Sequence, residues 1–129
     1  MIRNLMLIDD DEDDRGFFLE VVKDLYPEMN CIIAENGKDA LDKLSKESAK
    51  PELIFLDLNM PLMNGRQFLR EIKQREGFNG IPVVILSTSS DEKTKAETSQ
   101  LGATDFITKP DKFSVWQSTL KNVFNNFTE

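Results

Sequence analysis

The sequence predicts an α/β fold, a doubly wound parallel sheet of five strands with five helices on its two faces. Five short apolar runs alternate with longer stretches in which apolar residues recur every three or four positions. Three of these runs are apolar throughout, which favours strands covered on both faces, as in a parallel sheet. Helical crossovers between parallel strands are right-handed, so this order of elements gives a doubly wound sheet.

The five expected strands are short. The fifth is weaker than the others because it begins with Asp105. They span residues 5–8, 31–34, 53–56, 83–86 and 105–107.

Five expected helices follow the strands in turn. In the first, apolar residues recur from Phe17 to Leu25, and Pro27 ends the pattern. The fourth is mostly polar and ends at Gly102, a residue that suits a helix C-terminus. The four later helices are indicated at residues 40–44, 68–72, 90–101 and 115–127.

The last of these helices carries more aromatic residues than a solvated helix needs. We expect Val115, Leu120 and Val123 to lie in the core. For Trp116 and Phe127 two interpretations stay open, packing in the core or contact with a partner. A homodimer is one form of the second interpretation.

The composition excludes several classes of function. The chain has 129 residues, so we expect one domain over residues 1–129 and no output domain. The net charge of −7 argues against direct binding of nucleic acid or of an anionic membrane. The chain has no histidine, which excludes Ser-His-Asp hydrolases, Cys-His proteases, His-ligated zinc and a phosphohistidine carrier.

Cysteine usage and hydropathy bear on the compartment. Cys31 is the only cysteine, so an internal disulfide is excluded and the reducing cytoplasm is the expected location. The longest apolar runs have four to five residues, and we therefore expect no insertion into a membrane.

Polar side chains follow four of the five strands. In doubly wound sheets the functional crevice lies beyond the carboxyl ends of the strands. The first, third, fourth and fifth strands thus deliver carboxylates, hydroxyls and one amine to the same end of the sheet. These residues are Asp9 and Asp10, Asp57, Ser87 and Thr88, and Lys109.

The three carboxylates dominate the chemistry of this end. Two like charges about 4 Å apart repel by roughly 4 kcal/mol at an effective dielectric constant near 20. They therefore raise one another's pKa or recruit a cation. Oxygen ligands favour a hard ion, Mg²⁺, with Mn²⁺ or Ca²⁺ as alternatives. A magnesium ion beside carboxylates and an ammonium suits phosphoryl transfer, in which Asp57 would act as nucleophile.

Each of these residues also has an ordinary structural interpretation. Acidic runs such as residues 9–14 are commonly solvated helix starts, and we accept this for Asp11, Asp13 and Asp14. Serine and threonine after a strand are common turn or capping residues, and a single lysine is most often on the surface. Because such residues follow four strands that end at one edge of the sheet, a functional site is the favoured interpretation.

Four segments of the chain resemble the receiver domain of response regulators in two-component signalling. Together they cover nearly the whole chain in the family's order and spacing. They are LIDDD at 7–11, LDLNMPLMNG at 56–65, PVVILST at 82–88 and GATDFITKP at 102–110.

The resemblance implies a sheet order of 2-1-3-4-5 and a set of metal ligands. Asp57 would accept a phosphoryl group. Asp10 and Asp57 would supply carboxylate ligands to Mg²⁺, the main-chain carbonyl of Asn59 a third ligand, and Asp9 would hold a coordinated water.

The resemblance also implies roles for the later strands. Lys109 would pair with a phosphoryl oxygen, and a cis Lys109–Pro110 bond would fix its approach. The hydroxyl of Ser87 would bond a phosphoryl oxygen after transfer. Phe106 stands at the switch aromatic, expected to turn inward as Ser87 moves.

The function implied is that of a phosphorylation switch. The donor would be a sensor histidine kinase or a histidine phosphotransfer protein, and the output a downstream protein target. The chain would be no enzyme beyond catalysing its own phosphorylation and dephosphorylation.

Two other classes of protein are alternatives to a receiver domain. An aspartate-nucleophile phosphatase needs a second aspartate two residues after the first, where this chain has Asn59, and a cap insertion for which there is no length. A pseudo-receiver, a binding module that never takes phosphate, usually lacks one of the residues that this chain keeps.

Overall fold

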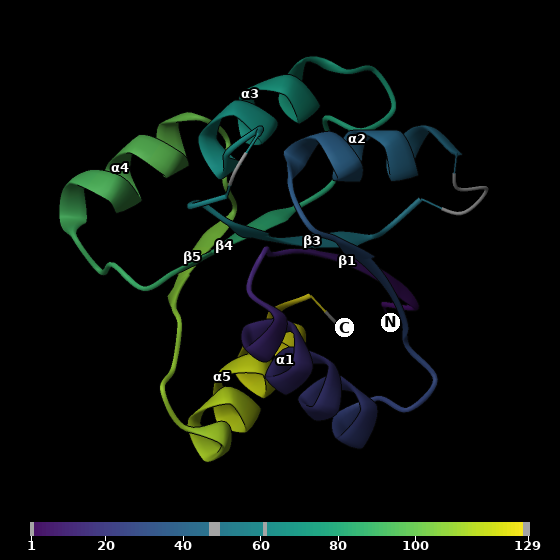
Figure 1. The fold of residues 1–129 in the computed structure, drawn as a ribbon, viewed down its shortest axis with the longest axis vertical. Coiled ribbons are helices and arrows are strands. Elements are labelled where there is room, and N and C mark those ends of the chain that lie inside the picture. The colour runs from purple at the N-terminus through teal and green to yellow at the C-terminus, as the bar shows by residue number, and fades with distance from the viewer. Residues whose placement is uncertain (1, 47–49, 61, 128–129) are drawn as a thin grey trace.

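A computed structural model of the chain describes residues 2–46, 50–60 and 62–127. Strands and helices alternate from one end to the other (Figure 1). In chain order they are β1 (Asn4–Ile8), α1 (Glu12–Leu25), β2 (Asn30–Ala34), α2 (Gly37–Lys46), β3 (Leu53–Asp57), α3 (Gly65–Gln74), β4 (Val83–Ser87), α4 (Glu92–Gln100), β5 (Asp105–Thr108) and α5 (Phe113–Asn126).

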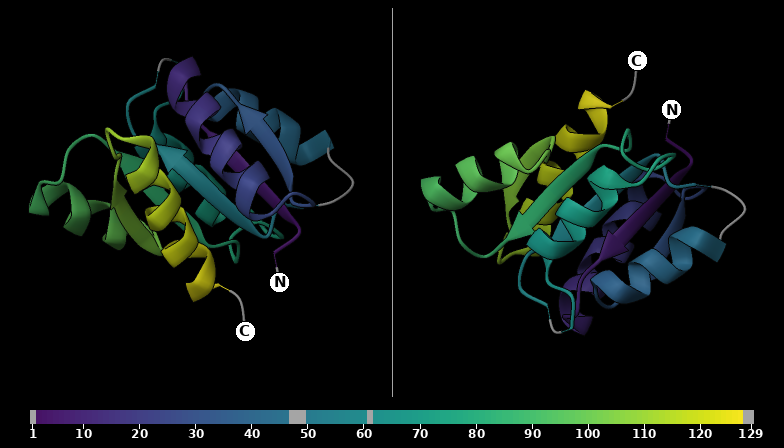
Figure 2. Two further views of the ribbon diagram at one scale, coloured as in Figure 1. Left: turned by 90° about the horizontal axis from the view of Figure 1, so that it is seen from below. Right: turned by 90° about the horizontal axis from the view of Figure 1, so that it is seen from above.

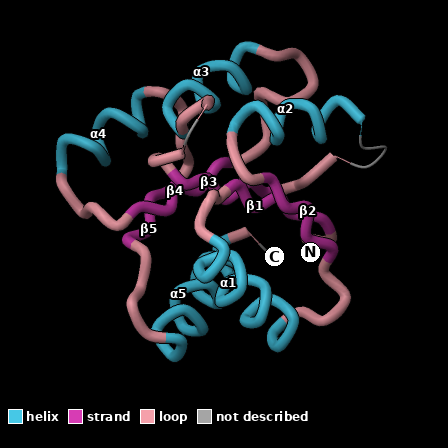
Figure 3. Tube along the Cα trace, viewed as in Figure 1, coloured by secondary structure: helices cyan, strands magenta, loops and turns pink. Residues whose placement is uncertain are grey.

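The five strands form one parallel sheet in the order β2-β1-β3-β4-β5, which confirms the predicted fold class and strand order. The sheet lies between two layers of helices (Figure 3). Helices α2, α3 and α4 cover one face, and α1 and α5 cover the other (Figures 1 and 2). No helix in the described ranges is long and apolar enough to cross a membrane.

The sheet separates two apolar cores, because successive side chains of a strand point to opposite faces. The core on the side of α2 and α3 includes Ile8, Leu56 and Ile85. The core on the side of α1 and α5 includes Leu7 and Phe55. A side chain at the end of a strand therefore lies on the same face of the sheet as the residue two positions before it.

The starts of α1 and α3 are set by capping residues that lie before the first apolar position. The side chain of Asp11 accepts a hydrogen bond from the N–H of Asp14, so α1 begins five residues before Phe17. Asn64 and Gln67 form a reciprocal capping box at the start of α3.

Helix α5 corrects one core prediction. Leu120, Val123 and Trp116 are buried, but Val115 is 42% exposed, so its predicted core position is wrong. Adjacent residues of a helix lie about 100° apart, so Trp116 facing the core turns Val115 toward solvent. Phe127 is half-buried against the same core.

Candidate functional site

Three charged side chains meet at the carboxyl end of the sheet, on the side of α1 and α5. Asp9, Asp57 and Lys109 come from β1, β3 and β5 or from the residue just after the strand. Each lies two positions after a residue of the α1–α5 core, and side chains two apart share a face. These core residues are Leu7, Phe55 and Ile107.

The structure brings the predicted carboxylates together. Asp9, Asp10 and Asp57 each offer one oxygen, and these three oxygens lie within 4.8 Å of one another. Asp9 is 1% exposed and Asp57 5% exposed, whereas Asp10 lies at the surface. Two buried carboxylates with a third at the mouth form a set of hard oxygen donors that is open on one side, which suits a divalent cation such as Mg²⁺ or Mn²⁺.

The ammonium of Lys109 lies among carboxylates. Its Nζ atom is 2.9 Å from Oδ2 of Asp9, 2.8 Å from Oδ2 of Asp14 and 3.6 Å from Oδ2 of Asp57. The lysine side chain is only 7% exposed. A buried cation at this place offsets part of the repulsion between the acids.

Asp14 corrects the interpretation of the acidic run. The sequence predicts a solvated Asp14, but its carboxylate binds Lys109. The signal that could have found it is the helix periodicity: Asp14 lies one turn before the buried Phe18, and residues four apart share a helix face. Asp13 lies one turn before the exposed Phe17, and it is exposed as expected.

The environment shifts the pKa of Asp57 and the pKa of Lys109. Burial, and then the charge of Asp9, raise the pKa of Asp57 to about 7, against the lowering effects of Lys109 and of the Asn59 N–H. Burial acts to lower the pKa of Lys109, but hydrogen bonds to Asp14 and Asp9 outweigh it, so this pKa lies above its usual range. Lys109 therefore stays charged, while the charge on Asp57 depends on its surroundings.

The predicted cis bond at Lys109–Pro110 is wrong, because every described peptide bond is trans. The trans form of a bond before proline is favoured by about 0.5–1 kcal/mol, so a cis bond needs an environment that imposes it. With this bond trans, the Lys109 ammonium reaches the carboxylates of Asp9, Asp14 and Asp57.

The predicted switch residues lie on the other side of the sheet. Ser87 is buried, and its hydroxyl oxygen accepts a hydrogen bond from the Ser89 N–H at 3.1 Å. Phe106 is half-buried and pairs in register with Ile85, two positions before Ser87. Its ring lies against a groove of about 190 Å³ between α4 and β5, with the Nζ of Lys95 5.8 Å from the ring centroid.

The loop after β3 returns directly onto the site. The Gly65 N–H donates to the Leu58 carbonyl at 3.0 Å. A Cβ atom on Gly65 would lie 2.4 Å from the carbonyl oxygen of Asp57, so only glycine fits there. Asn59 is exposed, and Pro61 of the same predicted motif lies outside the described residues.

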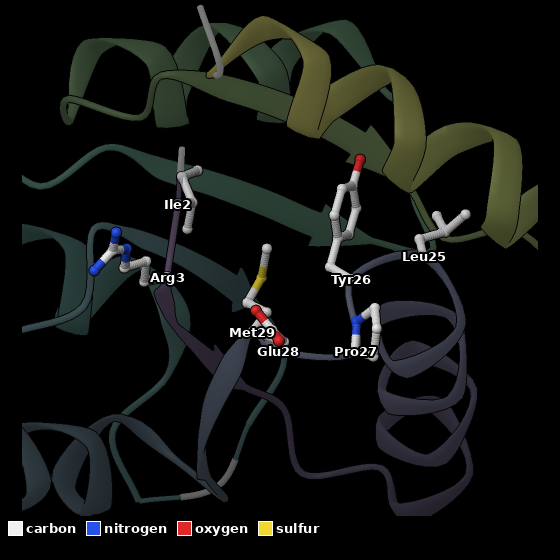
Figure 4. Close-up of a pocket in the computed structure, with 7 residues that line it drawn as sticks. All are labelled: Ile2, Arg3, Leu25, Tyr26, Pro27, Glu28 and Met29. Carbon is white, nitrogen blue, oxygen red and sulfur yellow. The ribbon is translucent and has the colours of Figure 1, made fainter.

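A separate cavity of about 590 Å³ lies at the opposite end of β1 (Figure 4). Tyr26 and Met29 line it together with the start of the chain, and its lining holds none of the predicted site residues. The strand-end cluster, rather than this cavity, is the candidate site.

Comparison with known proteins assigns the chain to a family. The family model described as response regulator receiver domain matches residues 5–121. Response regulator Rcp1 of Synechocystis sp. is 34% identical over 110 residues, covering 81% of this chain and 75% of Rcp1. A protein-glutamate methylesterase/protein-glutamine glutaminase of Treponema denticola is 43% identical over 109 residues, covering 82% of this chain. The match spans only 28% of that methylesterase.

Solved structures agree in fold. The phosphorylated cyanobacterial phytochrome response regulator RcpA has a TM-score of 0.87 at 29% identity, over 95% of this chain and 91% of that one. The Mn²⁺-bound form of Rcp1 has a TM-score of 0.81 at 32% identity, over 90% of each chain.

Proposed function

The chain belongs to the response-regulator receiver family, and we propose that it takes a phosphoryl group from a partner's phosphohistidine onto Asp57. The observation that carries this proposal is the convergence of Asp9, Asp10, Asp57 and Lys109 at one end of the sheet. The phosphorylated state of the related RcpA supports it.

In this proposal Asp57 would act as the nucleophile. An oxygen of its carboxylate would attack phosphorus, so a P–O bond forms as the P–N bond to the partner's imidazole breaks. The carboxylate must be charged to attack, and Lys109 favours that charged form. The ammonium, 3.6 Å from Oδ2 of Asp57, would then move to pair with an oxygen of the transferred group.

The acidic cluster fits a divalent cation. We propose that Asp10 and Asp57 ligate Mg²⁺ directly, with the main-chain carbonyl of Asn59, and that Asp9 holds a coordinated water. The close approach of the three carboxylate oxygens and the Mn²⁺ bound to the related Rcp1 support this assignment. When bound, the ion would neutralise negative charge on the phosphoryl oxygens.

Ser87 and Phe106 would transmit the modification. We propose that the Ser87 hydroxyl leaves its bond with Ser89 for a phosphoryl oxygen, and that Phe106 moves inward from its half-buried position. The surface of α4, β5 and α5 changes as a result. A downstream protein would read that surface, and a second copy of the chain is the alternative reader.

The donor would be a sensor histidine kinase or a histidine phosphotransfer protein; similar domains also occur within proteins named as histidine kinases. Residues 1–129 would form one receiver domain in the cytoplasm. The domain would catalyse only its own phosphorylation and dephosphorylation.

Intact mass after incubation with acetyl phosphate and Mg²⁺ tests the proposal. We expect one phosphoryl adduct, absent with EDTA and absent in Asp57→Asn. A chain that gains no adduct and also fails to bind beryllofluoride with Mg²⁺ would instead be a pseudo-receiver. Continuous release of phosphate from external esters would indicate the phosphatase alternative.

A further inference from the structure

Lys109 has one carboxylate partner more than the proposed chemistry uses. An ammonium has three N–H donors. Its contacts with Asp9 and Asp14, at 2.9 and 2.8 Å, are within hydrogen-bond distance, whereas Oδ2 of Asp57 is 3.6 Å away. The lysine is therefore held by the two acids that do not accept the phosphoryl group.

The fold fixes Asp14 in this place. Its N–H donates to the Asp11 side chain at 3.1 Å, which ties it into the first turn of α1. One turn later, Phe18 is buried, and the centroid of its ring lies 4.9 Å from the centroid of the Phe55 ring. The Asp14 side chain is 25% exposed, so water screens its ion pair with Lys109 less than it screens a surface pair.

We propose that Asp14 is a positioning residue that holds Lys109 away from Asp57 in the unphosphorylated state and thereby opposes phosphorylation. The inference rests on the proposed roles of Asp57 and Lys109. To pair with a phosphoryl group, the ammonium must leave or share its Asp14 contact. The charge of Asp14 also repels the incoming dianion, which acts in the same direction.

The test compares Asp14→Asn with Asp13→Asn. Both variants remove one negative charge from the first turn of α1, but Asp13 is exposed and makes no described ion pair. The measured quantity is the dissociation constant of beryllofluoride at saturating Mg²⁺. We expect about five-fold tighter binding in Asp14→Asn, as for the loss of one partly screened ion pair, and no change in Asp13→Asn.

A second measurement needs neither metal nor phosphoryl mimic. The side-chain ammonium of Lys109, assigned by its absence in Lys109→Met, should give a slowly exchanging NMR signal in the metal-free protein. Asp14→Asn should broaden or remove this signal, and Asp13→Asn should keep it. If Asp14 had a purely structural role, Asp14→Asn would lower the melting temperature and leave the ammonium signal in place.

The outcomes distinguish failure of the proposed role of Asp14 from failure of the proposed phosphorylation of Asp57. An unchanged ammonium signal in Asp14→Asn, or unchanged or weaker beryllofluoride binding, overturns the role of Asp14. Failure of the unmodified protein to bind beryllofluoride overturns the proposed function and, with it, the effect of Asp14 on phosphorylation. The ammonium signal then still decides whether Asp14 holds Lys109.

Discussion

The main-chain N–H of Lys109 donates a hydrogen bond to the carbonyl oxygen of Ser87 over 2.7 Å. This bond continues the parallel pairing of β4 and β5 one position beyond the pair Ser87 and Thr108. The sheet thus fixes the backbones of both residues relative to each other. A change of state at the site must therefore move side chains rather than slide one strand along the other.

Gly65 should be indispensable for stability. Replacing it with alanine puts a Cβ atom 2.4 Å from the Asp57 carbonyl oxygen and 2.6 Å from the Leu58 Cα, and backbone cannot give way cheaply. We expect Gly65→Ala to lower the free energy of unfolding by about 2 kcal/mol or more, measured by urea denaturation.

Gly16→Ala is the matched control for that experiment. Gly16 lies within α1, where a Cβ atom would meet nothing within 4 Å. Alanine should stabilise the protein there by about 0.5–1 kcal/mol. Equal effects of the two substitutions would contradict the proposed packing of the loop.

Asp57 should make the metal-free protein less stable as the pH rises. Its pKa is about 7 in the folded chain and near the ordinary 3.8 when unfolded, so the fold penalises the charged form. The free energy of unfolding therefore falls between about pH 4 and pH 7 and then levels off. Asp57→Asn removes this penalty and should stabilise the protein by about 2 kcal/mol more at pH 8 than at pH 4.

Chemical denaturation in EDTA at the two pH values measures this difference. Asp13→Asn serves again as the control, because it removes an exposed charge from the same end of the sheet. If Asp57→Asn were equally stabilising at pH 4 and pH 8, the buried carboxylate would not carry a raised pKa.

Lys109→Met should separate metal binding from phosphoryl recognition. Loss of the ammonium leaves Asp9 and Asp57 without their cation, so a divalent metal ion should bind more tightly. Pairing with the phosphoryl oxygen is lost, and beryllofluoride binding should weaken by about ten-fold or more. Calorimetric titrations of Mg²⁺, and then of beryllofluoride, measure both effects; parallel changes of the two affinities would contradict the assigned role.

The sequence was sufficient to predict the architecture. Strands buried on both faces leave uninterrupted apolar runs, and such runs mark β1, β3 and β4 in this chain. The gathering of Asp9, Asp57 and Lys109 was predictable because parallel strands end at one edge. Their exact roles in phosphoryl transfer stay predictions.

Helix rotation explains why Asp14 and Val115 lie elsewhere than predicted. Residue type alone predicts solvent for Asp14 and the core for Val115, whereas helix phase turns Asp14 toward Lys109 and Val115 toward solvent. The buried Phe18 sets the rotation of α1, and the buried Trp116 sets the rotation of α5. Phe18 lies four residues after Asp14, and Trp116 lies directly after Val115. The trans form of Lys109–Pro110 was beyond the reach of local sequence, because tertiary packing selects the isomer.

Locating the phosphoryl group tests the proposed role of Asp57 most directly. The protein is incubated with acetyl phosphate and Mg²⁺ and then reduced with borohydride, which converts an aspartyl-phosphate to homoserine, and its peptides are sequenced by mass spectrometry. We expect homoserine at position 57 and at no other aspartate. Homoserine at Asp9, Asp10 or Asp14 instead, with Asp57 unmodified, would contradict it.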